Sequence, residues 1–501
     1  PMTWMMRWAG PFPLFLAEAK GARVVDVDGH EYVDLCLGDT GAMAGHAPEP
    51  VVRAVAARAA AGLTAMLPTE DAAWAGEELG RRFGLALWQF TLSATDANRF
   101  AIRICRAVTG RPRILVFNGC YHGTVDETFA TLRDDGSVGV RPGNVGPPVD
   151  PALTTKVVEL NDLDALEAAL GSGDVACVLA EPALTNIGIV LPDEGFHEAL
   201  RELTRRTGTL LVIDETHTFS AGSGGYTAAY GLEPDLLTIG KAIGGGVPVG
   251  AFGLTGEVAR RALAQDDADD EDVGGVGGTL AGNALSLAAV RATLGEVLTD
   301  EAFARMTSLG ERLAADIGRA ILDAGVPWHV ARLGCRAEYR FRREPPRNGG
   351  EAAAAGDEEL ERFLHLYALN RDSMAPDLDE PWRVASQEPL TEEESAAVDA
   401  FLDQLPARTF AGAAPSAQCS PISRGSGRTV VAFTNVTWDM ATAQRDAGFD
   451  GLADWLRETL RICAGLRNVH LIVRAHPAEA GNTRERVIED VLASCADTVD
   501  E

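Results

Sequence analysis

Residues 210–253 constrain the fold more than any other stretch, because two short apolar runs there end in charged side chains of opposite sign. Residues 210–213 are apolar and stop at Asp214, and residues 236–239 are apolar and lead to Lys241. Short apolar runs bounded by polar residues are typical of buried strands in a parallel sheet. Open α/β sheets bind their ligands at the carboxyl ends of such strands. The pattern therefore predicts a binding site that contains both Asp214 and Lys241.

Lys241 also matters because the chain uses so little lysine. Of its 44 lysine and arginine residues, only Lys20, Lys156 and Lys241 are lysines. A lysine amine can form a Schiff base, whereas the guanidinium of arginine stays protonated and cannot. We interpret Lys241 as the residue that holds pyridoxal phosphate (PLP) as an aldimine. Asp214 would keep the cofactor's pyridine nitrogen protonated, so that the ring accepts electrons. The alternative is a strand-end lysine that faces solvent.

The residues around both strands resemble a known family. The sequence D-E-T-H-T-F begins at Asp214, and P-D-L-L-T-I-G-K-A-I-G-G-G-V-P-V-G-A-F-G runs through Lys241. Both resemble the class III aminotransferases of the fold-type-I PLP enzymes, with glutamate semialdehyde aminomutase and the β-amino-acid aminotransferases most similar. The resemblance covers roughly residues 7–405. It implies an α/β fold with a mostly parallel central sheet in a large domain, and a smaller α/β domain after it.

The turn after a predicted strand at 88–92 is expected to bind the cofactor phosphate. It runs through Ser93, Ala94 and Thr95 toward a predicted helix at 98–108. Free amides at a helix N-terminus attract anions. The turn resembles the family's S-G-T-E-A phosphate cup, with Ala94 where the family has glycine. An ordinary helix cap is the alternative.

The resemblance implies further cofactor contacts at two other strand ends. The predicted strand 113–117 leads to a segment similar to the family's G-x-Y-H-G loop, in which Tyr121 stacks on the ring beside His122. A buried loop pair is the alternative for these two residues. Asn186, after the predicted strand 175–180, matches the asparagine that hydrogen-bonds the cofactor's phenolic oxygen.

Four other residues are assigned by the same resemblance. His217 stands where the family commonly has glutamine or methionine beside the cofactor, and Thr216 replaces a valine that packs on the ring. Glu181 is expected to support the site rather than react. Thr279, in G-G-T-L-A-G-N, matches the threonine that reaches the phosphate of the partner subunit's cofactor. This implies a homodimer with shared active sites.

The substrate is predicted from two residues outside these motifs. Arg7 resembles the carboxylate-binding arginine of glutamate semialdehyde aminomutase, and Glu380 in A-P-D-L-D-E resembles its gating glutamate. A surface arginine and a loop acid are the alternatives. We expect amino transfer between a small-molecule amino acid with a carboxylate and a keto or aldehyde acceptor. Intramolecular transfer by an aminomutase is the runner-up, and a catalytically decayed scaffold is the third possibility.

Charge and cysteine content narrow the function classes. A net charge of −29 argues against nucleic acid or an anionic membrane as partner. No apolar run approaches the ~20 residues of a membrane helix. The 8 cysteines form no CxxC pair, which indicates neither a metal site nor a disulfide framework. A cytoplasmic location follows as the expectation.

The pattern of apolar residues and linkers divides the chain into five parts. They are an N-terminal segment at 1–62 whose start is expected to be missing, a large PLP-binding domain at 63–300, a small domain at 301–405, a linker at 406–428, and a tail at 429–501. The tail reads as a β-α-β-α unit and resembles a part of the capsule-polysaccharide and glycosyltransferase proteins with Rossmann-like domains.

Shorter elements are also predicted by periodicity and turn residues. They are a hairpin at 23–34, helices at 50–62, 70–83, 194–207, 283–298 and 301–323, a Gly/Pro-rich loop at 135–155, and a solvated acidic loop at 265–272.

Overall fold

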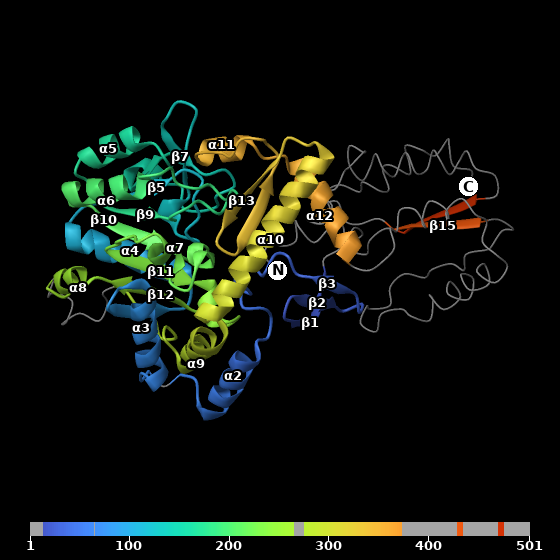
Figure 1. Cartoon of the computed structure of the whole chain (residues 1–501), viewed down its shortest axis with the longest axis horizontal. Coiled ribbons are helices and arrows are strands. Elements are labelled where there is room, and N and C mark those ends of the chain that lie inside the picture. The colour runs from blue at the N-terminus through green and yellow to red at the C-terminus, as the bar shows by residue number, and fades with distance from the viewer. Residues whose placement is uncertain (1–13, 65, 265–274, 373–427, 434–468, 475–501) are drawn as a thin grey trace. The chain divides into compact units, whose positions relative to one another are not determined.

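The computed structural model describes residues 14–64, 66–264, 275–372, 428–433 and 469–474 (Figure 1). The chain separates into two compact units, residues 1–389 and residues 390–501. Among the described residues, no helix is both long and apolar enough to cross a membrane.

The first unit is built on a seven-stranded sheet. In spatial order its strands are β4 (Leu87–Thr91), β12 (Gly250–Leu254), β11 (Leu236–Gly240), β10 (Leu210–Asp214), β9 (Val175–Ala180), β5 (Arg113–Phe117) and β8 (Thr155–Val158). Strand β12 is antiparallel to both of its neighbours, and the other pairs are parallel. The predicted α/β fold with a mostly parallel sheet is confirmed.

Helices cover both faces of this sheet. Helix α4 (Ala94–Thr109) carries the chain from β4 toward β5, whereas α5 (Leu163–Gly171) and α6 (Phe196–Thr207) carry it back from β8 toward β10. Because such crossovers are right-handed, opposite directions of travel place α4 on one face and α5 and α6 on the other. Apolar side chains from all three helices form one buried core with the central strands, which are apolar along their whole length.

Several predicted elements agree with the structure to the residue. Strands β5 and β9 have the predicted bounds, and so does helix α3 (Glu70–Phe83). The hairpin and the helix near residue 50 appear as β2 (Arg23–Asp26) with β3 (Glu31–Val33), and as α2 (Glu49–Ala61).

Other predicted elements were wrong in extent. Helix α4 begins four residues before the predicted 98, because Ser93 caps it. The predicted loop 135–155 contains strand β7 (Val138–Val140), which pairs with β6 (Ala130–Leu132), and it ends where β8 begins. The predicted helix 283–298 is α9 (Ala284–Ala292) followed by a π-helical turn at Thr293–Val297.

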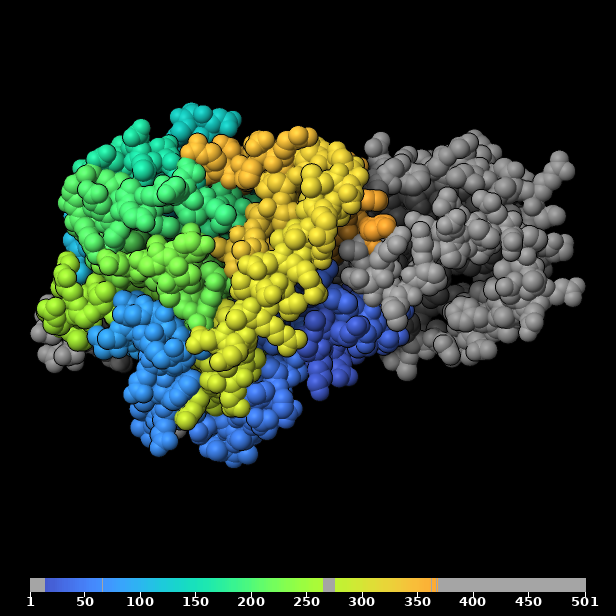
Figure 2. All heavy atoms as spheres, in the orientation of Figure 1, coloured from blue at the N-terminus to red at the C-terminus, as the bar shows by residue number. Residues whose placement is uncertain are grey.

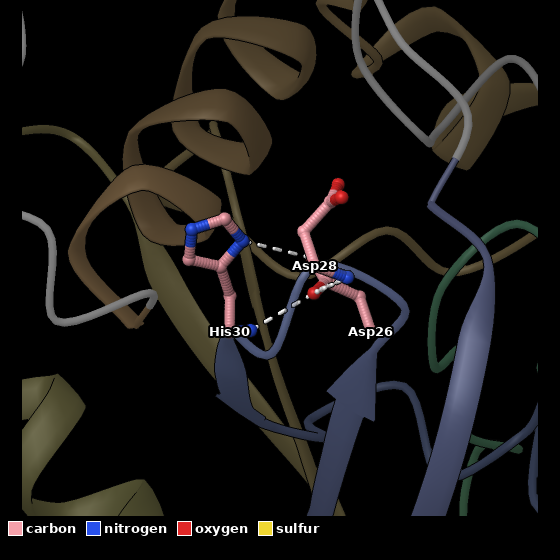
Figure 3. Close-up of side chains that lie close together, drawn as sticks. All are labelled: Asp26, Asp28 and His30. Carbon is pink, nitrogen blue, oxygen red and sulfur yellow. Dashed lines mark hydrogen bonds and ion pairs between the residues drawn. The ribbon is translucent and has the colours of Figure 1, made fainter.

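The hairpin turn between β2 and β3 is closed by one buried carboxylate (Figure 3). Asp26 accepts hydrogen bonds from the amides of Asp28 (3.0 Å) and His30 (2.9 Å) and from the Tyr32 hydroxyl (2.8 Å). Its Oδ2 also lies 3.2 Å from the His30 ring. Asp26, Asp28 and His30 form the one group in the described ranges with metal-ligand spacing. Since the Asp26 oxygens are already used within the turn, we assign the group to the hairpin.

A two-stranded ribbon follows the long helix α10 (Asp300–Ala324). Strands β13 (His329–Leu333) and β14 (Arg336–Arg340) are antiparallel, and α11 (Gly349–Ala354) and α12 (Glu358–Asp372) come next. Figure 2 shows the yellow and orange side chains of this region against the green part of the same unit. The turn at Gly334 lies so close to the rest of the unit that a Cβ there would be 2.1 Å from the Ser220 carbonyl.

The second unit contains β15 (Arg428–Phe433) and β16 (Val469–Arg474), which pair in parallel. This agrees with the two strands expected for the tail, whereas the expected helices lie outside the described residues. The boundary predicted at 405 also lies outside them, whereas the one predicted at 428 falls on the first residue of β15. Both boundaries stay predictions.

Candidate active site

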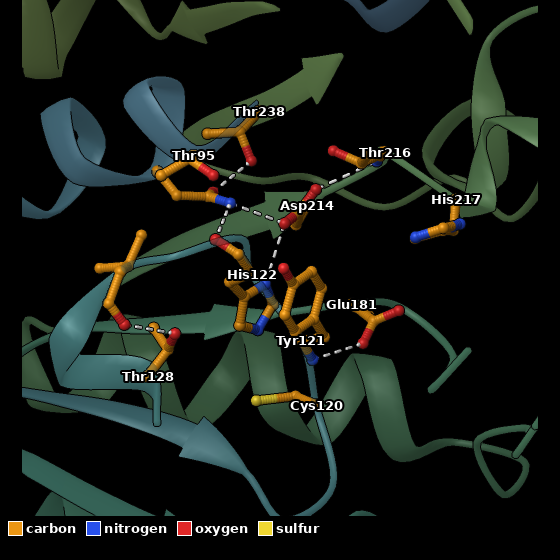
Figure 4. A network of polar contacts seen from close by, with 12 residues as sticks. Thr95, Cys120, Tyr121, His122, Thr128, Glu181, Asp214, Thr216, His217 and Thr238 are labelled. Carbon is orange, nitrogen blue, oxygen red and sulfur yellow. Dashed lines mark hydrogen bonds and ion pairs between the residues drawn. The ribbon is translucent and has the colours of Figure 1, made fainter. Parts of the chain in front are cut away.

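The candidate site lies at the carboxyl ends of the central strands, where several loops converge. Asp214 ends β10, and Lys241 directly follows the neighbouring strand β11. The strand register pairs Asp214 with Thr238, three residues before Lys241. Figure 4 shows Asp214 close to His122, which follows β5, and shows His217 on the segment after β10. The sheet therefore brings together His122 and Asp214, which are 92 positions apart in the sequence.

Asp214 is buried, yet its carboxylate keeps its charge. Its Oδ2 accepts hydrogen bonds from Asn98 Nδ2 (2.8 Å) and lies 2.9 Å from His122 Nδ1, and its Oδ1 accepts from the Thr216 amide (3.0 Å). Burial alone raises the pKa of Asp214, but the hydrogen bond and charge of His122, with the Thr216 and Asn98 bonds, lower it to about 2. A carboxylate has about four acceptor positions, so room remains for one more donor.

His122 is the buried cation that balances Asp214. Burial alone lowers the pKa of its imidazole, but Cys120 and Asp214 together hold that pKa well above its usual value. Its backbone carbonyl accepts a hydrogen bond from Asn98 Nδ2 (3.1 Å), which ties the loop after β5 to helix α4. Thr238 in turn donates to Asn98 Oδ1 (2.7 Å), so the amide orientation of Asn98 is fixed.

Lys241 has a backbone conformation that favours glycine. Its φ of +48° places it in the left-handed region, which a non-glycine residue adopts at an energetic cost and most often at functional sites. Its Nζ lies 2.6 Å from Asp39 Oδ2 and 2.7 Å from His217 Nε2. The amine is thus held between a carboxylate and an imidazole at the end of β11.

His217 is neutral and links Lys241 to the N-terminal segment. Burial, followed by the charge of Lys241, lowers the pKa of His217 to about 4. Its Nε2 therefore accepts from the Lys241 ammonium, and its Nδ1 donates to Thr40 Oγ1 at 2.8 Å. Thr40 then donates to the Asp39 carbonyl at 2.5 Å. Asp39 and Thr40 both have positive φ, so this loop is strained like Lys241 itself.

The predicted phosphate cup is the N-terminus of α4. Ser93 caps the helix by accepting from the Asp96 amide (3.3 Å), and Thr95 Oγ1 accepts from the Thr124 amide (3.1 Å). The amides of Ala94 and Thr95 lie in the first turn and have no partner within the helix. Ala94 is not among the residues with positive φ, so its methyl group causes no backbone strain.

Tyr121 and Glu181 lie on the loops that follow β5 and β9 and contact each other. The Tyr121 ring meets Phe129 edge-on, with centroids 6.3 Å apart, and its amide donates to Glu181 Oε1 (3.2 Å). Glu181 also accepts a hydrogen bond from the Thr185 hydroxyl. Burial raises the pKa of Glu181, so this carboxyl is a weaker acid than Asp214.

Two predicted site residues lie at the surface of the described chain, and two lie outside it. Asn186 is exposed on the loop after β9. Thr279 is exposed beside a surface hollow of about 530 Å³, which is not lined by Lys241 or Asp214. Arg7 and Glu380 are outside the described residues.

Three residues of the site were not predicted. Asn98 lies in a predicted helix, where no motif marks it as a site residue. Asp39 and Thr40 lie in a glycine-containing segment. The only sequence signal for Asp39 and Thr40 was their place before the turn at Gly41, since their partners are about two hundred positions away.

The site fits a phosphorylated pyridine cofactor. A buried carboxylate that stays ionised can accept a hydrogen bond from a protonated ring nitrogen. The amides at the N-terminus of α4 can bind a phosphate. Two buried polar atoms beside Asp214, His122 Nε2 and Thr216 Oγ1, lack a hydrogen-bond partner among the described residues. Leaving buried polar atoms without hydrogen bonds costs free energy, so a bound group that pairs with them would stabilise the site.

The fold and this site define a PLP-dependent enzyme of fold type I. The chain belongs to the class III aminotransferases, because the model of that family matches residues 4–335.

Two relatives by sequence are named as glutamate-1-semialdehyde aminomutases. Glutamate-1-semialdehyde 2,1-aminomutase of Anaeromyxobacter sp. (strain Fw109-5) is 34% identical over 363 residues, which are 72% of this chain and 83% of the relative. Glutamate-1-semialdehyde 2,1-aminomutase 2 of Bacillus cereus (strain AH187) is 36% identical over 366 residues, 72% of this chain and 82% of the relative.

Similar solved structures include both aminomutases and transaminases. A glutamate-1-semialdehyde-aminomutase from Pseudomonas aeruginosa PAO1 has 52% identity and a TM-score of 0.72, and the match covers 74% of this chain and 83% of that one. A variant of the same enzyme was solved in complex with PMP. A β-phenylalanine aminotransferase from Variovorax paradoxus has 30% identity and a TM-score of 0.65, covering 74% and 82%.

Proposed function

We propose that the chain binds PLP through Lys241 and transfers an amino group between an amino acid and a carbonyl acceptor. The observation that carries this proposal is the arrangement of Lys241, strained at the end of β11, beside an ionised Asp214 at the end of β10. The family and its PLP- and PMP-containing neighbours support the same cofactor.

Each residue of the site has a proposed role. Asp214 would hold the protonated ring nitrogen of the cofactor, and His122 and Asn98 keep that carboxylate ionised. The Ser93, Ala94 and Thr95 turn binds the phosphate. Bound PLP supplies the electron sink for breaking a carbon–hydrogen bond of the substrate.

The remaining residues orient the ring and move protons. Tyr121 would cover one face of a bound ring and exclude water, and Asn186 would bond its phenolic oxygen. The Lys241 amine removes a proton from the substrate carbon and returns it as general base and acid. Neutral His217 accepts a hydrogen bond from that amine, which keeps Nζ aimed into the site.

The test is a comparison of Lys241→Ala with Lys20→Ala, which removes an exposed lysine of β1 (Leu16–Lys20). The wild type and the Lys20 variant should show the visible absorption of bound cofactor, which borohydride bleaches, and should transaminate. Lys241→Ala should lose the borohydride-sensitive band and turnover while the protein stays folded. Transamination by purified Lys241→Ala without added amine would refute the proposal.

A second candidate is intramolecular amino transfer, as the names of the sequence relatives indicate. An aminomutase converts one substrate without a separate acceptor, whereas a transaminase needs both a donor and an acceptor. Incubation with glutamate 1-semialdehyde alone therefore distinguishes them: sustained turnover supports the aminomutase, and a single half-turnover supports the transaminase.

We also propose a homodimer in which Thr279 completes the partner's phosphate site. Apolar side chains around the hollow beside Thr279 are exposed, including Met66 (80%) and Leu67 (76%), and a partner surface would cover them. Thr279→Ala should remain dimeric by sedimentation but bind PLP more weakly. A monomeric wild-type protein with bound PLP would contradict this arrangement.

Three other expectations are proposals: the substrate contacts of Arg7 and Glu380, the division into domains, and a cytoplasmic location. Arg7 and Glu380 would contact the substrate, and the domain division places them on either side of the large domain. The described cysteines are free thiols, which suits a cytoplasmic location.

A further inference from the structure

One arginine near the site has a fixed position, yet one nitrogen of its guanidinium group lacks a hydrogen-bond partner among the described residues. Arg336 begins β14, directly after the Gly334 turn that packs against the backbone of Ser220 and Ala221. The Cys335 amide donates to the Ser220 carbonyl at 3.0 Å, which fixes this turn to the segment that follows His217. The position of Arg336 is therefore set by backbone contacts and not by its own side chain.

The Arg336 guanidinium is oriented by two partners. Its Nε donates to Glu338 Oε1 at 2.7 Å, and its Nη2 pairs with the same carboxylate and reaches the Thr185 carbonyl at 3.4 Å. Glu338 is fixed in turn, because its Oε2 accepts from the Ile189 amide at 3.1 Å. The fork thus lies between β14 and the loop after β9.

The third nitrogen of this fork has no partner. Arg336 Nη1 is buried and makes no hydrogen bond to any of the described residues. A buried guanidinium donor without an acceptor is costly, and arginine is well suited to bind a carboxylate through its planar fork. Arg336 Nη1 is therefore a donor that an anionic ligand could satisfy.

The turn that carries Arg336 contacts the segment just after His217, because the Cys335 amide bonds the Ser220 carbonyl. The charge of Arg336 is one of the influences that lower the pKa of His217, after burial and Lys241. His217 itself is 2.7 Å from Lys241 Nζ. The cofactor phosphate is expected at the N-terminus of α4, on a different loop, and so does not need Arg336. An anion bound at Nη1 would belong to the substrate.

We propose that Arg336 is a specificity-determining residue that binds the carboxylate of the amino acid substrate through Nη1. The proposal rests on the proposed function and names the substrate class of that site. Amines that lack a carboxylate would leave Nη1 unsatisfied and would react more slowly. Glu338 acts as a positioning residue, since it orients the fork without contacting the substrate.

The test compares donors that differ only in the carboxylate. Holoenzyme is mixed with α-, β- and ω-amino acids and with the matching amines in which a methyl group replaces the carboxylate, and the cofactor's spectral change is followed. In Arg336→Met, kcat/KM for the best carboxylate donor should fall about 10- to 100-fold, whereas rates with amines should change by no more than about twofold. Arg319→Met, which removes an exposed arginine of helix α10, should match the wild type.

Two further measurements keep the result clear. Arg336→Lys retains the charge but not the fork, so it should give a smaller loss with the same substrate dependence, even where Arg336→Met is unstable. Calorimetric titration with glutarate, which has no amine to transfer, should show weaker binding to both variants than to the wild type. Equal losses for amines and amino acids, or unchanged glutarate affinity, would overturn the proposal. If the wild-type spectrum responds to no donor of either kind, the proposed function itself fails.

Discussion

Asp214 shows how a single residue keeps a charge where burial opposes it. Its pKa of about 2 lies below the usual 3.8, so it stabilises the fold above pH 3.8 and loses that contribution as the pH falls toward 2. His122, whose pKa is raised, contributes in the opposite sense: its stabilisation is present at low pH and is lost as the pH rises through the raised value. The pair is therefore strongest at neutral pH.

We predict that Asp214→Asn weakens both the fold and the chemistry. Breaking a buried ion pair typically costs about 3–5 kcal/mol of stability. Deprotonation of His122 would reduce this loss, because it removes the unpaired buried charge. Turnover should fall at least about 100-fold, the scale of positioned proton control, because a neutral amide no longer holds the ring proton. Denaturant unfolding and steady-state rates measure the two effects. Asp28→Asn, exposed in the hairpin turn, serves as control, and a normal rate in Asp214→Asn would remove the assigned role.

His217 gives a pH prediction for the cofactor-free protein. Its pKa of about 4 is below the usual 6.5, so between these values the unfolded chain takes up a proton that the folded chain does not. The folded state therefore loses stability as the pH falls from 6.5 toward 4. His217→Gln should remove up to about 2 kcal/mol of the loss between pH 7.5 and 5.

The measurement is the difference in denaturant midpoint between the two pH values. The groups that face His217 are Lys241, Asp39, Asp214 and Arg336, and all of them remain in the variant. The same pH response in wild type and His217→Gln would show that His217 does not titrate in this way.

Sequence alone could identify some of these residues and not others. Lys241 and Asp214 stand at the ends of apolar runs, a local signal. Asn98 contacts Asp214 from 116 positions away, and Asp39 contacts Lys241 from 202 positions away. No local pattern marks such pairs, because the packing of the sheet and the N-terminal segment creates them. Arg336 was missed for the same reason.

At the scale of elements, buried strands with continuous apolar sequence were predicted best. Strands β5 and β9 are apolar throughout, so their bounds followed from composition. Strand β12 contains two glycines, and β8 is only four residues long, so neither has a strong strand signal. Pairing with β11 and β5 places them in the sheet, which is a tertiary effect.

The glycine that weakens the signal of β12 also positions the phosphate cup. A Cβ on Gly250 would lie 2.4 Å from the Ser93 backbone, at the start of helix α4. We predict that Gly250→Ala displaces this turn, lowers stability by about 1–3 kcal/mol and weakens PLP binding. Gly256→Ala is the matched control, because a Cβ there meets nothing within 4 Å. Melting temperature and PLP titration are the measurements, and unchanged PLP affinity in Gly250→Ala would contradict the role of the cup.

At the scale of the whole molecule, the chain divides into two compact units, and the described site residues lie in the first. Every described site residue lies before residue 341, and the class III family match ends at 335. The second unit begins near residue 390 and has its own pair of parallel strands. Because each unit is compact by itself, we expect the first to fold without the second.

We therefore predict that a chain cut after Leu405 retains PLP binding, dimerisation and the activity of the full chain. The segment predicted as a linker at 406–428 is rich in Pro, Ala, Ser and Gly, a composition typical of interdomain linkers. A cut after Asp372 is the matched control: it enters the first unit and removes Glu380, so it should lose activity. Cofactor absorbance, sedimentation and turnover compare the three chains. A monomeric or cofactor-free protein ending at Leu405 would show that the tail belongs to the enzyme, because in that case residues beyond 405 must stabilise the site or the subunit contact.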